Sequence, residues 1–197
     1  MKIKSFIFGP FQTNTYVVSD ESGRAMIIDP ACLYPYEQQA LARYIETEGL
    51  QVERIVATHG HLDHLWGAKW VTEKWQLPVQ LHEADIPMAK AMQEQYELFG
   101  IGARAETFEV ERIQNSDIRY QIIETPGHTP GSVCLYWEKE KVLLSGDTLF
   151  CMGYGRTDLP GGNMAQLIQS LDRLFELPSD VRVYPGHGES TTIGDER

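Results

Sequence analysis

Seven side chains capable of binding metal ions fall into four short segments of the 197-residue chain. The segments are Thr58–His64 (THGHLDH), Thr125–Gly131 (TPGHTPG), Ser145–Thr148 (SGDT) and Pro185–Gly188 (PGHG). Imidazole and carboxylate groups are ordinary ligands of Zn²⁺, and of Fe and Mn as alternatives. The predicted ligands are His59, His61, Asp63, His64, His128, Asp147 and His187.

The spacing within the first segment favours two adjacent metal ions over one. His59 and His61 are two residues apart, so an extended backbone directs both side chains the same way. Asp63 and His64 come where a helix is expected to begin, and they should project to a different part of the pocket. We therefore expect two divalent metal ions, with Zn²⁺ as the first choice.

Each of the four segments follows a predicted strand, which is where binding loops form in α/β architectures. Alternating and apolar runs predict the strands, and helical spacing predicts the helices. The expected strands are residues 2 to 8, Asn14 to Ser19, Arg24 to Asp29, Val52 to Ala57, Val79 to His82, Phe108 to Ile113, Ile118 to Thr125, Ser132 to Trp137, Val142 to Leu144 and Val181 to Tyr184. The expected helices are Tyr36 to Glu48, His64 to Trp75, Ala84 to Phe99 and Met164 to Leu177.

This order of elements suggests two similar β-plus-α halves packed sheet to sheet with helices outside, in a single domain covering residues 1–197. Apolar residues make up 42% of the chain and charged residues 23%, which is ordinary for a globular protein. The formal net charge of −11 argues against nucleic acid and against anionic membranes as partners.

The cysteines indicate the cellular compartment, and the other reactive residues are expected to have structural roles. Three cysteines match no disulfide framework, and no segment is long and apolar enough for a signal peptide or a membrane span, so a reducing, cytoplasmic location is expected. Cys151 is expected to be a buried apolar group, and His82 to be a histidine without a metal-binding role. The tryptophans Trp66, Trp70 and Trp75 are expected to belong to the core.

The four motifs, in this order, resemble those of the metallo-β-lactamase superfamily, from Thr58 to Gly188. The strand that ends in Ile28-Asp29-Pro30 also fits that family. The resemblance implies an α+β fold, an αββα sandwich of two packed mixed sheets with helices on the outer faces. It also implies that His59, His61 and His128 hold one metal, that Asp63, His64 and His187 hold the second, and that Asp147 bridges the two.

Within the superfamily, the chain looks most like the glyoxalase II-type hydrolases, which cleave thioesters such as S-lactoylglutathione. The resemblance implies a small-molecule thioester substrate and a hydroxide shared by the two metals as nucleophile, oriented by Asp63. Asp147 argues against the β-lactamases, whose matching position usually carries cysteine. Longer glyoxalase II proteins carry a C-terminal helical extension, whereas this chain ends ten residues after His187, so the resemblance is to a compact branch.

Besides a non-catalytic metal-binding or interaction protein, two catalytic alternatives remain open at this point. The stretch Gly155-Arg156-Thr157-Asp158 also appears in persulfide dioxygenases of the same superfamily, which use one iron held by the equivalents of His59, His128 and Asp147. Hydrolysis of another ester, a lactone or a lactam is the other alternative. Tyr154 and Arg156 are predicted to line the pocket and meet an anionic substrate, or else Arg156 pairs with Asp158 and shapes the loop.

Overall fold

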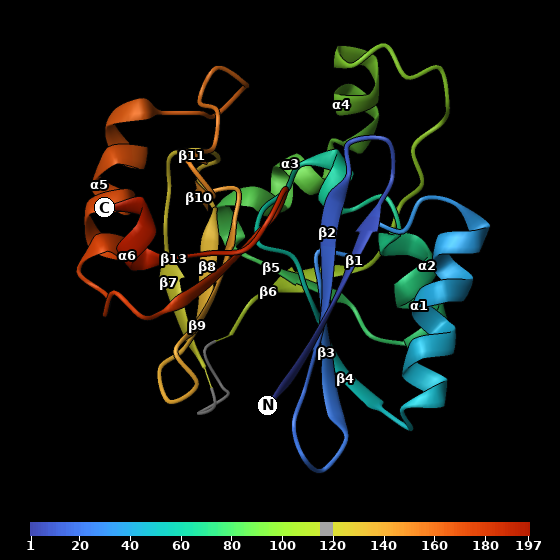
Figure 1. Cartoon of the computed structure of the whole chain (residues 1–197). Helices are drawn as coiled ribbons and strands as arrows, with labels where there is room; N and C mark the ends of the chain where they lie inside the picture. Colours follow the sequence, from blue (N-terminus) through green and yellow to red (C-terminus); the bar gives the residue numbers. More distant parts are fainter. Residues whose placement is uncertain (115–119) are drawn as a thin grey trace. The chain divides into compact units, whose positions relative to one another are not determined.

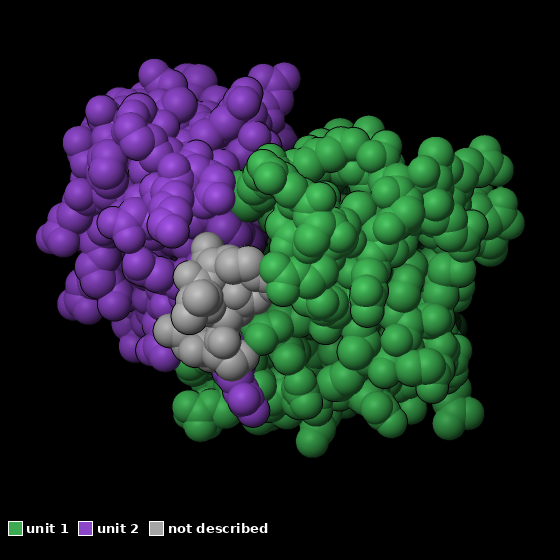
Figure 2. Space-filling model, turned by 90° about the horizontal axis from the view of Figure 1, so that it is seen from below, with its two compact units in different colours: residues 1–113 green, residues 114–197 purple. Residues whose placement is uncertain are grey.

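A computed structural model describes residues 1–114 and 120–197. Its internal contacts divide the chain into two compact units, unit 1 from Met1 to Ile113 and unit 2 from Gln114 to Arg197 (Figure 1 and Figure 2). Each unit contains its own sheet and its own helices. The prediction of one domain over residues 1–197 stays a prediction.

Unit 1 contains a six-stranded mixed sheet in which the strands are neighbours in the order of the chain. The strands are β1 (Lys2–Phe8), β2 (Thr13–Ser19), β3 (Arg24–Ile28), β4 (Gln51–Val56), β5 (Val79–Leu81) and β6 (Val110–Arg112). The first three form an antiparallel meander, and β3 to β6 pair in parallel. Parallel strands place their carboxyl ends at one edge, so the loops after β3 and β4 begin side by side.

Helices α1 (Pro35–Thr47) and α2 (Ala68–Trp75) share a hydrophobic core with the strands of unit 1. Leu41 and Ile45 of α1 and Val71 of α2 are buried among apolar side chains of β2, β3 and β4. Trp66, Trp70 and Trp75 are partly buried against the same cluster, as expected. Alternation along a strand explains why one face of the sheet supplies this core.

Two predicted helices of unit 1 differ from the observed ones. The helix expected from His64 begins only at Ala68, because Leu62–His64 forms a separate 3₁₀ turn, η1. The helix expected over Ala84 to Phe99 is divided into the 3₁₀ turn η2 (Glu83–Asp85), α3 (Ile86–Lys90) and α4 (Met92–Leu98). Both breaks lie where side chains bind the backbone of the ligand loop, as described below.

Unit 2 contains a five-stranded mixed sheet in the order β13-β12-β9-β8-β7. The strands are β7 (Gln121–Glu124), β8 (Val133–Trp137), β9 (Val142–Gly146), β12 (Arg182–Pro185) and β13 (Thr191–Thr192). Only β9 and β12 pair in parallel; the other neighbours are antiparallel. The short hairpin of β10 (Leu149–Phe150) and β11 (Gly153–Tyr154) follows β9.

Helix α5 (Met164–Phe175) covers this sheet and buries Leu167, Leu171 and Leu174 in the core of unit 2. The Asn163 side chain caps the helix by accepting a hydrogen bond from Gln166 N at 3.1 Å. The last element is the short α6 (Ile193–Glu196). The hairpin β10–β11, strand β13 and α6 were not predicted, because segments of two to four residues carry no periodic signal.

The remaining predicted elements agree with the structure, apart from their ends. The strand expected over Ile118 to Thr125 appears as β7 where it is described, and its first two residues lie outside the described residues. No helix in residues 1–114 and 120–197 is long and apolar enough to cross a membrane. Two mixed sheets, each with its own helices, confirm the α+β class.

Candidate metal centre

The first ligand set belongs to unit 1 and lies in the loop after β4. It contains His59, His61, Asp63 and His64, all of which are buried. The imidazole of His59 lies 4.8 Å from that of His61 and 4.1 Å from that of His64, measured between ring centroids. The pair His59 and His61 therefore lies close to His64, which belongs to the second predicted pair of this segment.

Asp29, at the end of the neighbouring strand β3, anchors this loop. One carboxylate oxygen accepts a hydrogen bond from Thr58 N at 2.7 Å, and the other accepts from the Thr58 hydroxyl at 2.9 Å. That second oxygen also lies 3.0 Å from Nδ1 of His64. Because β3 and β4 are parallel neighbours, their ends bring Asp29 to the ligand loop. Sequence reasoning noted Asp29 only as part of a resemblance and missed this role.

Polar contacts favour the same tautomer in each of these imidazoles. The Asp29 carboxylate, 3.0 Å from Nδ1 of His64, favours the proton on Nδ1, which leaves the lone pair of the neutral ring on Nε2. The Thr58 hydroxyl already donates to Asp29, so at 3.1 Å it accepts from Nδ1 of His59. Both rings are thus oriented as metal ligands through Nε2.

Asp63 completes the set with a carboxylate oxygen. Its Oδ2 lies 3.5 Å from Nε2 of His64 and accepts a hydrogen bond from the Thr13 hydroxyl at 2.8 Å. A tetrahedral Zn²⁺ about 2.1 Å from each of two ligands would separate them by about 3.4 Å. The distance between these two atoms therefore fits a shared metal ion.

The second ligand set belongs to unit 2 and comes from the loops after β7, β9 and β12. Asp147 Oδ2 lies 3.6 Å from Nε2 of His128 and 3.5 Å from Nε2 of His187. The parallel pair β9–β12 brings Asp147 and His187 to one edge, where Gly186 N donates to Gly146 O at 2.7 Å. One oxygen of the Asp147 carboxylate is therefore close to the Nε2 atoms of both imidazoles.

The loop after β11 orients His128. Nδ1 of His128 donates to the backbone oxygen of Arg156 at 2.7 Å, so Nε2 presents its lone pair toward Asp147. Gly155 permits this approach, because a Cβ there would lie 1.9 Å from Asp147 O and 3.0 Å from Nδ1 of His128. The Arg156 carbonyl was not predicted, since a backbone group leaves no sequence signal.

The donor types and their separations fit divalent metal ions in both sets. In both sets an imidazole Nε2 atom lies 3.5–3.6 Å from a carboxylate oxygen. The lone pairs of two such atoms repel each other, and a cation bound between them would turn this repulsion into attraction. All seven predicted ligands belong to one of the two sets. Their assignment to particular metals stays a prediction.

Tyr154 and Arg156, the predicted substrate contacts, are both exposed in unit 2. The Arg156 guanidinium forms a bidentate ion pair with Asp158, at 2.6 and 2.7 Å. This pair is the loop contact considered as the alternative, and it lowers the pKa of Asp158 to about 2. Contact of either residue with a substrate stays a prediction.

The remaining reactive residues have roles outside the two sets. Nδ1 of His82 accepts a hydrogen bond from Ala84 N at 3.2 Å and so caps η2. Cys151 is exposed, so the prediction of a buried side chain was wrong; it lies at the turn between the two short, unpredicted strands β10 and β11. Cys32 and Cys134 are buried free thiols, and burial raises their pKa values to about 12 and about 11.

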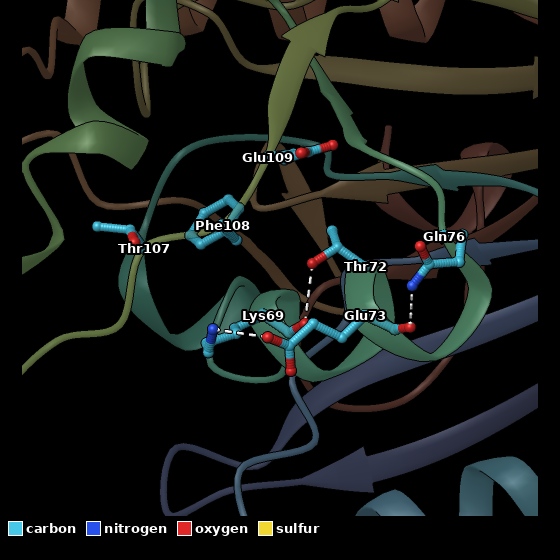
Figure 3. A pocket seen from close by; sticks show the side chains of 7 residues that line it. All are labelled: Lys69, Thr72, Glu73, Gln76, Thr107, Phe108 and Glu109. Atoms are coloured by element: carbon cyan, nitrogen blue, oxygen red, sulfur yellow. Dashed lines mark hydrogen bonds and ion pairs between the residues drawn. The ribbon is translucent and has the colours of Figure 1, made fainter.

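A hollow of about 440 Å³ also lies in unit 1, between α2 and the segment that leads into β6 (Figure 3). The polar side chains that residues 69–76 contribute to this hollow bind one another or the backbone of the same segment. Lys69 pairs with Glu73 at 2.7 Å, the Thr72 hydroxyl donates to Lys69 O, and the Gln76 amide donates to Glu73 O. None of the seven predicted ligands lines this hollow.

Comparison with known proteins agrees with these observations. An uncharacterized protein of Aquifex aeolicus is 40% identical to this chain, with 100% of the chain and 94% of the relative covered. The probable metallo-hydrolase YqgX of Bacillus subtilis is 34% identical, and the hydroxyacylglutathione hydrolase GloC of Haemophilus influenzae is 32% identical. In both cases 100% of the chain and 95% of the relative are covered.

Solved structures show the same fold. The structure of TTHA1623 in a di-iron-bound form is 34% identical with a TM-score of 0.88, covering 98% of this chain and 96% of that one. The BLEG-1 B3 metallo-beta-lactamase is 33% identical with a TM-score of 0.87, covering 99% and 96%. ETHE1 from Myxococcus xanthus is 27% identical with a TM-score of 0.76, covering 100% and 81%.

The metallo-β-lactamase fold predicted from the motifs is therefore confirmed. Residues 8–187 match the sequence pattern of the metallo-beta-lactamase superfamily, which is nearly the whole chain. The match includes the four ligand-bearing loops of both units. This chain belongs to the metallo-β-lactamase superfamily.

Proposed function

We propose that this protein is a dinuclear metal-dependent hydrolase that cleaves a small-molecule thioester of the S-lactoylglutathione type. The observation that carries the proposal is the Asp147 carboxylate, with Oδ2 within 3.6 Å of the Nε2 atoms of both His128 and His187. We propose that the two ligand sets hold two divalent ions, Zn²⁺ before Fe or Mn, with Asp147 as the bridge. The likeness to TTHA1623, whose structure is in a di-iron-bound form, supports a site for two metal ions. The likeness to the hydroxyacylglutathione hydrolase GloC supports a thioester substrate.

Divalent ions held by the two ligand sets would supply a Lewis acid that lowers the pKa of a bound water molecule and polarises the substrate carbonyl. The chain's own residues orient the ligands. Thr58 and the Arg156 carbonyl accept hydrogen bonds from Nδ1 of His59 and His128, and the Asp29 carboxylate lies 3.0 Å from Nδ1 of His64. Each of these three imidazoles therefore presents the lone pair of Nε2 before any metal binds. Asp63, held by the Thr13 hydroxyl, would accept a proton or hydrogen bond from the attacking water.

Metal content and turnover of one thioester test the proposal together. About two metals per chain and hydrolysis of S-lactoylglutathione are the expected result. Loss of hydrolysis on chelation, followed by recovery on adding Zn²⁺, Fe²⁺ or Mn²⁺ separately, would identify the competent metal. A protein with two bound metals that leaves a panel of thioesters intact would overturn the substrate assignment.

A persulfide dioxygenase is the second candidate. The likeness to ETHE1 from Myxococcus xanthus and the Gly155–Asp158 stretch favour it. One iron per chain and oxygen consumption on glutathione persulfide would establish this activity in place of hydrolysis. Because BLEG-1 is described as a B3 metallo-beta-lactamase, the same panel should include nitrocefin and a lactone.

We also propose that Arg156 and Tyr154 contact the anionic part of the substrate. The guanidinium already holds a carboxylate with two hydrogen bonds, so it can hold a substrate carboxylate in the same way after exchange with Asp158. Arg156→Ala should raise KM for S-lactoylglutathione roughly 10-fold and leave kcat within about twofold. An unchanged KM in this variant would limit Arg156 to shaping the loop.

A further inference from the structure

The side chain of Gln95, on α4, is buried beside the ligand loop of unit 1 although its own helix lies at the surface. Its neighbours Gln93, Glu94 and Glu97 are exposed. A buried carboxamide costs free energy unless its donors and acceptor are bound, so its partners indicate what the residue does.

The partners of Gln95 are the peptide groups on both sides of the predicted ligand His61. Its Oε1 accepts from Leu62 N at 2.9 Å, and its Nε2 donates to Gly60 O at 3.0 Å. The carboxamide therefore binds the backbone as a neighbouring strand would. His61 has an extended backbone, with φ −72° and ψ 149°, and the bonds on either side restrain that conformation.

The same amide group also closes the break between α3 and α4. Nε2 of Gln95 donates to Met88 O at 3.0 Å, and Ala91 N donates to that oxygen at 3.1 Å. In a continuous helix Met92 N would be the donor to Met88 O. One side chain therefore joins the helix break to the ligand loop.

A second contact fixes the loop to the same segment. Asp85, which is fully buried in η2, accepts a hydrogen bond from Gly60 N at 2.9 Å. A Cβ at position 60 would lie 3.0 Å from Asp85 O and 3.2 Å from Cβ of Met88. The loop and the segment from Glu83 to Leu98 are thus in direct backbone contact, and three polar groups of residues 60–62 are bound by it.

We propose that Gln95 is a positioning residue for His61, and that α4 is coupled to metal binding through it. The proposal rests on the metal-binding role of His61 proposed above. Metal loading should stabilise α4, and loss of the Gln95 carboxamide should weaken the site that contains His61. Substitutions of groups that orient metal ligands typically cost 10–100-fold in metal affinity.

Cobalt titration of the full chain tests this. Gln95→Met keeps the volume and removes all three hydrogen bonds, Gln95→Glu keeps the acceptor for Leu62 N, and His61→Ala removes the ligand itself. Gln93→Ala is the matched control, because it removes a neighbouring carboxamide whose bonds, from Ala105 N at 2.9 Å and to Glu97 at 3.4 Å, do not involve the ligand loop.

We expect Gln95→Met to bind one of two Co²⁺ ions about 10–100-fold more weakly and with an altered visible absorption spectrum. Gln93→Ala should match wild type in both, and Gln95→Glu should lie between. A folded Gln95→Met protein with wild-type affinity and spectrum would overturn the coupling alone. A wild-type chain that binds no metal at these histidines would overturn the coupling and the proposed function together.

Hydrogen exchange on the wild-type protein keeps the inference testable if Gln95→Met does not fold. Removing metal should lower the protection of backbone amides in residues 92–98 as well as in 58–64, while strands β1 and β2 stay protected. Unchanged exchange in residues 92–98 would contradict the coupling.

Discussion

At the scale of single residues, the site is prepared by groups that orient the imidazoles. The Thr58 hydroxyl and the Arg156 carbonyl accept hydrogen bonds from Nδ1 of His59 and His128, and the Asp29 carboxylate lies 3.0 Å from Nδ1 of His64. Each ring therefore presents Nε2 as an acceptor. The metals need not select the tautomer, because hydrogen bonds within each unit already do so.

Removing the proposed bridging carboxylate should be the most damaging single substitution. Asp147→Ala removes the oxygen that lies within 3.6 Å of two imidazoles. We expect activity to fall by more than about 100-fold and metal content to drop toward one ion or fewer per chain. Asp172→Ala, which removes an exposed carboxylate on α5, is the control and should match wild type. Full activity of the Asp147 variant would disprove the bridge.

Gly155 offers a sharper test of the second ligand set, since the change adds only one methyl group. Its Cβ would overlap Asp147 O and approach Nδ1 of His128, so Gly155→Ala must displace the loop that orients His128. We expect activity to fall about 10–100-fold and stability to fall by about 1–3 kcal/mol.

The control is Gly153→Ala, at a position where a Cβ meets nothing within 4 Å. Equal metal content and activity in the two variants would mean that the close approach at position 155 has no functional role.

At the scale of elements, parallel strand pairs bring the ligands together. In unit 1, β3 and β4 bring Asp29 to the His59–His64 loop, and in unit 2, β9 and β12 bring Asp147 to His187. The cores behind these strands also contain ionisable groups. Cys134 lies in the middle of β8, packed with α5, and its thiol bonds with Thr125 and Ser145.

The buried thiols should make stability fall at alkaline pH. A thiol in the unfolded chain ionises near pH 8.5, whereas burial raises the pKa of Cys134 to about 11 and that of Cys32 to about 12. The folded state therefore keeps protons that the unfolded state releases. The stabilisation is complete below about pH 8.5 and is lost as pH rises toward the folded pKa values.

Urea unfolding at pH 8, 9 and 10 measures this effect. The pH dependence should be weaker in Cys134→Ala by about one released proton, whereas Cys151→Ala, which removes an exposed thiol, should keep the wild-type slope. An identical slope in all three proteins would exclude the buried thiol as the cause.

At the scale of the whole molecule, the chain is strongly acidic, with 28 Asp and Glu against 17 Lys and Arg. Two of these carboxylates, Asp63 and Asp147, belong to the two ligand sets. Divalent cations that bind there would offset part of the repulsion in the folded state and would bind the unfolded chain far less well.

Chelation should therefore lower the melting temperature. At a free metal concentration about 100 times Kd, binding adds about 2.7 kcal/mol, which corresponds to roughly 5–10 °C for a chain of this length. Differential scanning calorimetry of loaded and chelated protein measures the shift, and Asp147→Ala should show a smaller one. Equal melting temperatures with and without metal would argue against binding at these residues.

The sequence alone determined the seven candidate ligands, the α+β class and the superfamily, because histidines and aspartates in short glycine-rich segments after strands leave a strong local pattern. It also predicted most strands and helix α5, because the spacing of apolar residues in α5 repeats over three turns. Only the tertiary structure revealed the roles of Asp29, Gln95 and the Arg156 carbonyl, since each acts on a partner 28 or more residues away in the chain.

The helix break at Ala91 was decided in the same way. Local propensity favours a continuous helix there, but the backbone polar groups of the ligand loop need partners, and buried side chains from η2 and α4 supply them. A pattern along the chain reports which face of an element is apolar. It does not report which distant backbone group a buried carboxamide will bind, because that depends on how the elements pack.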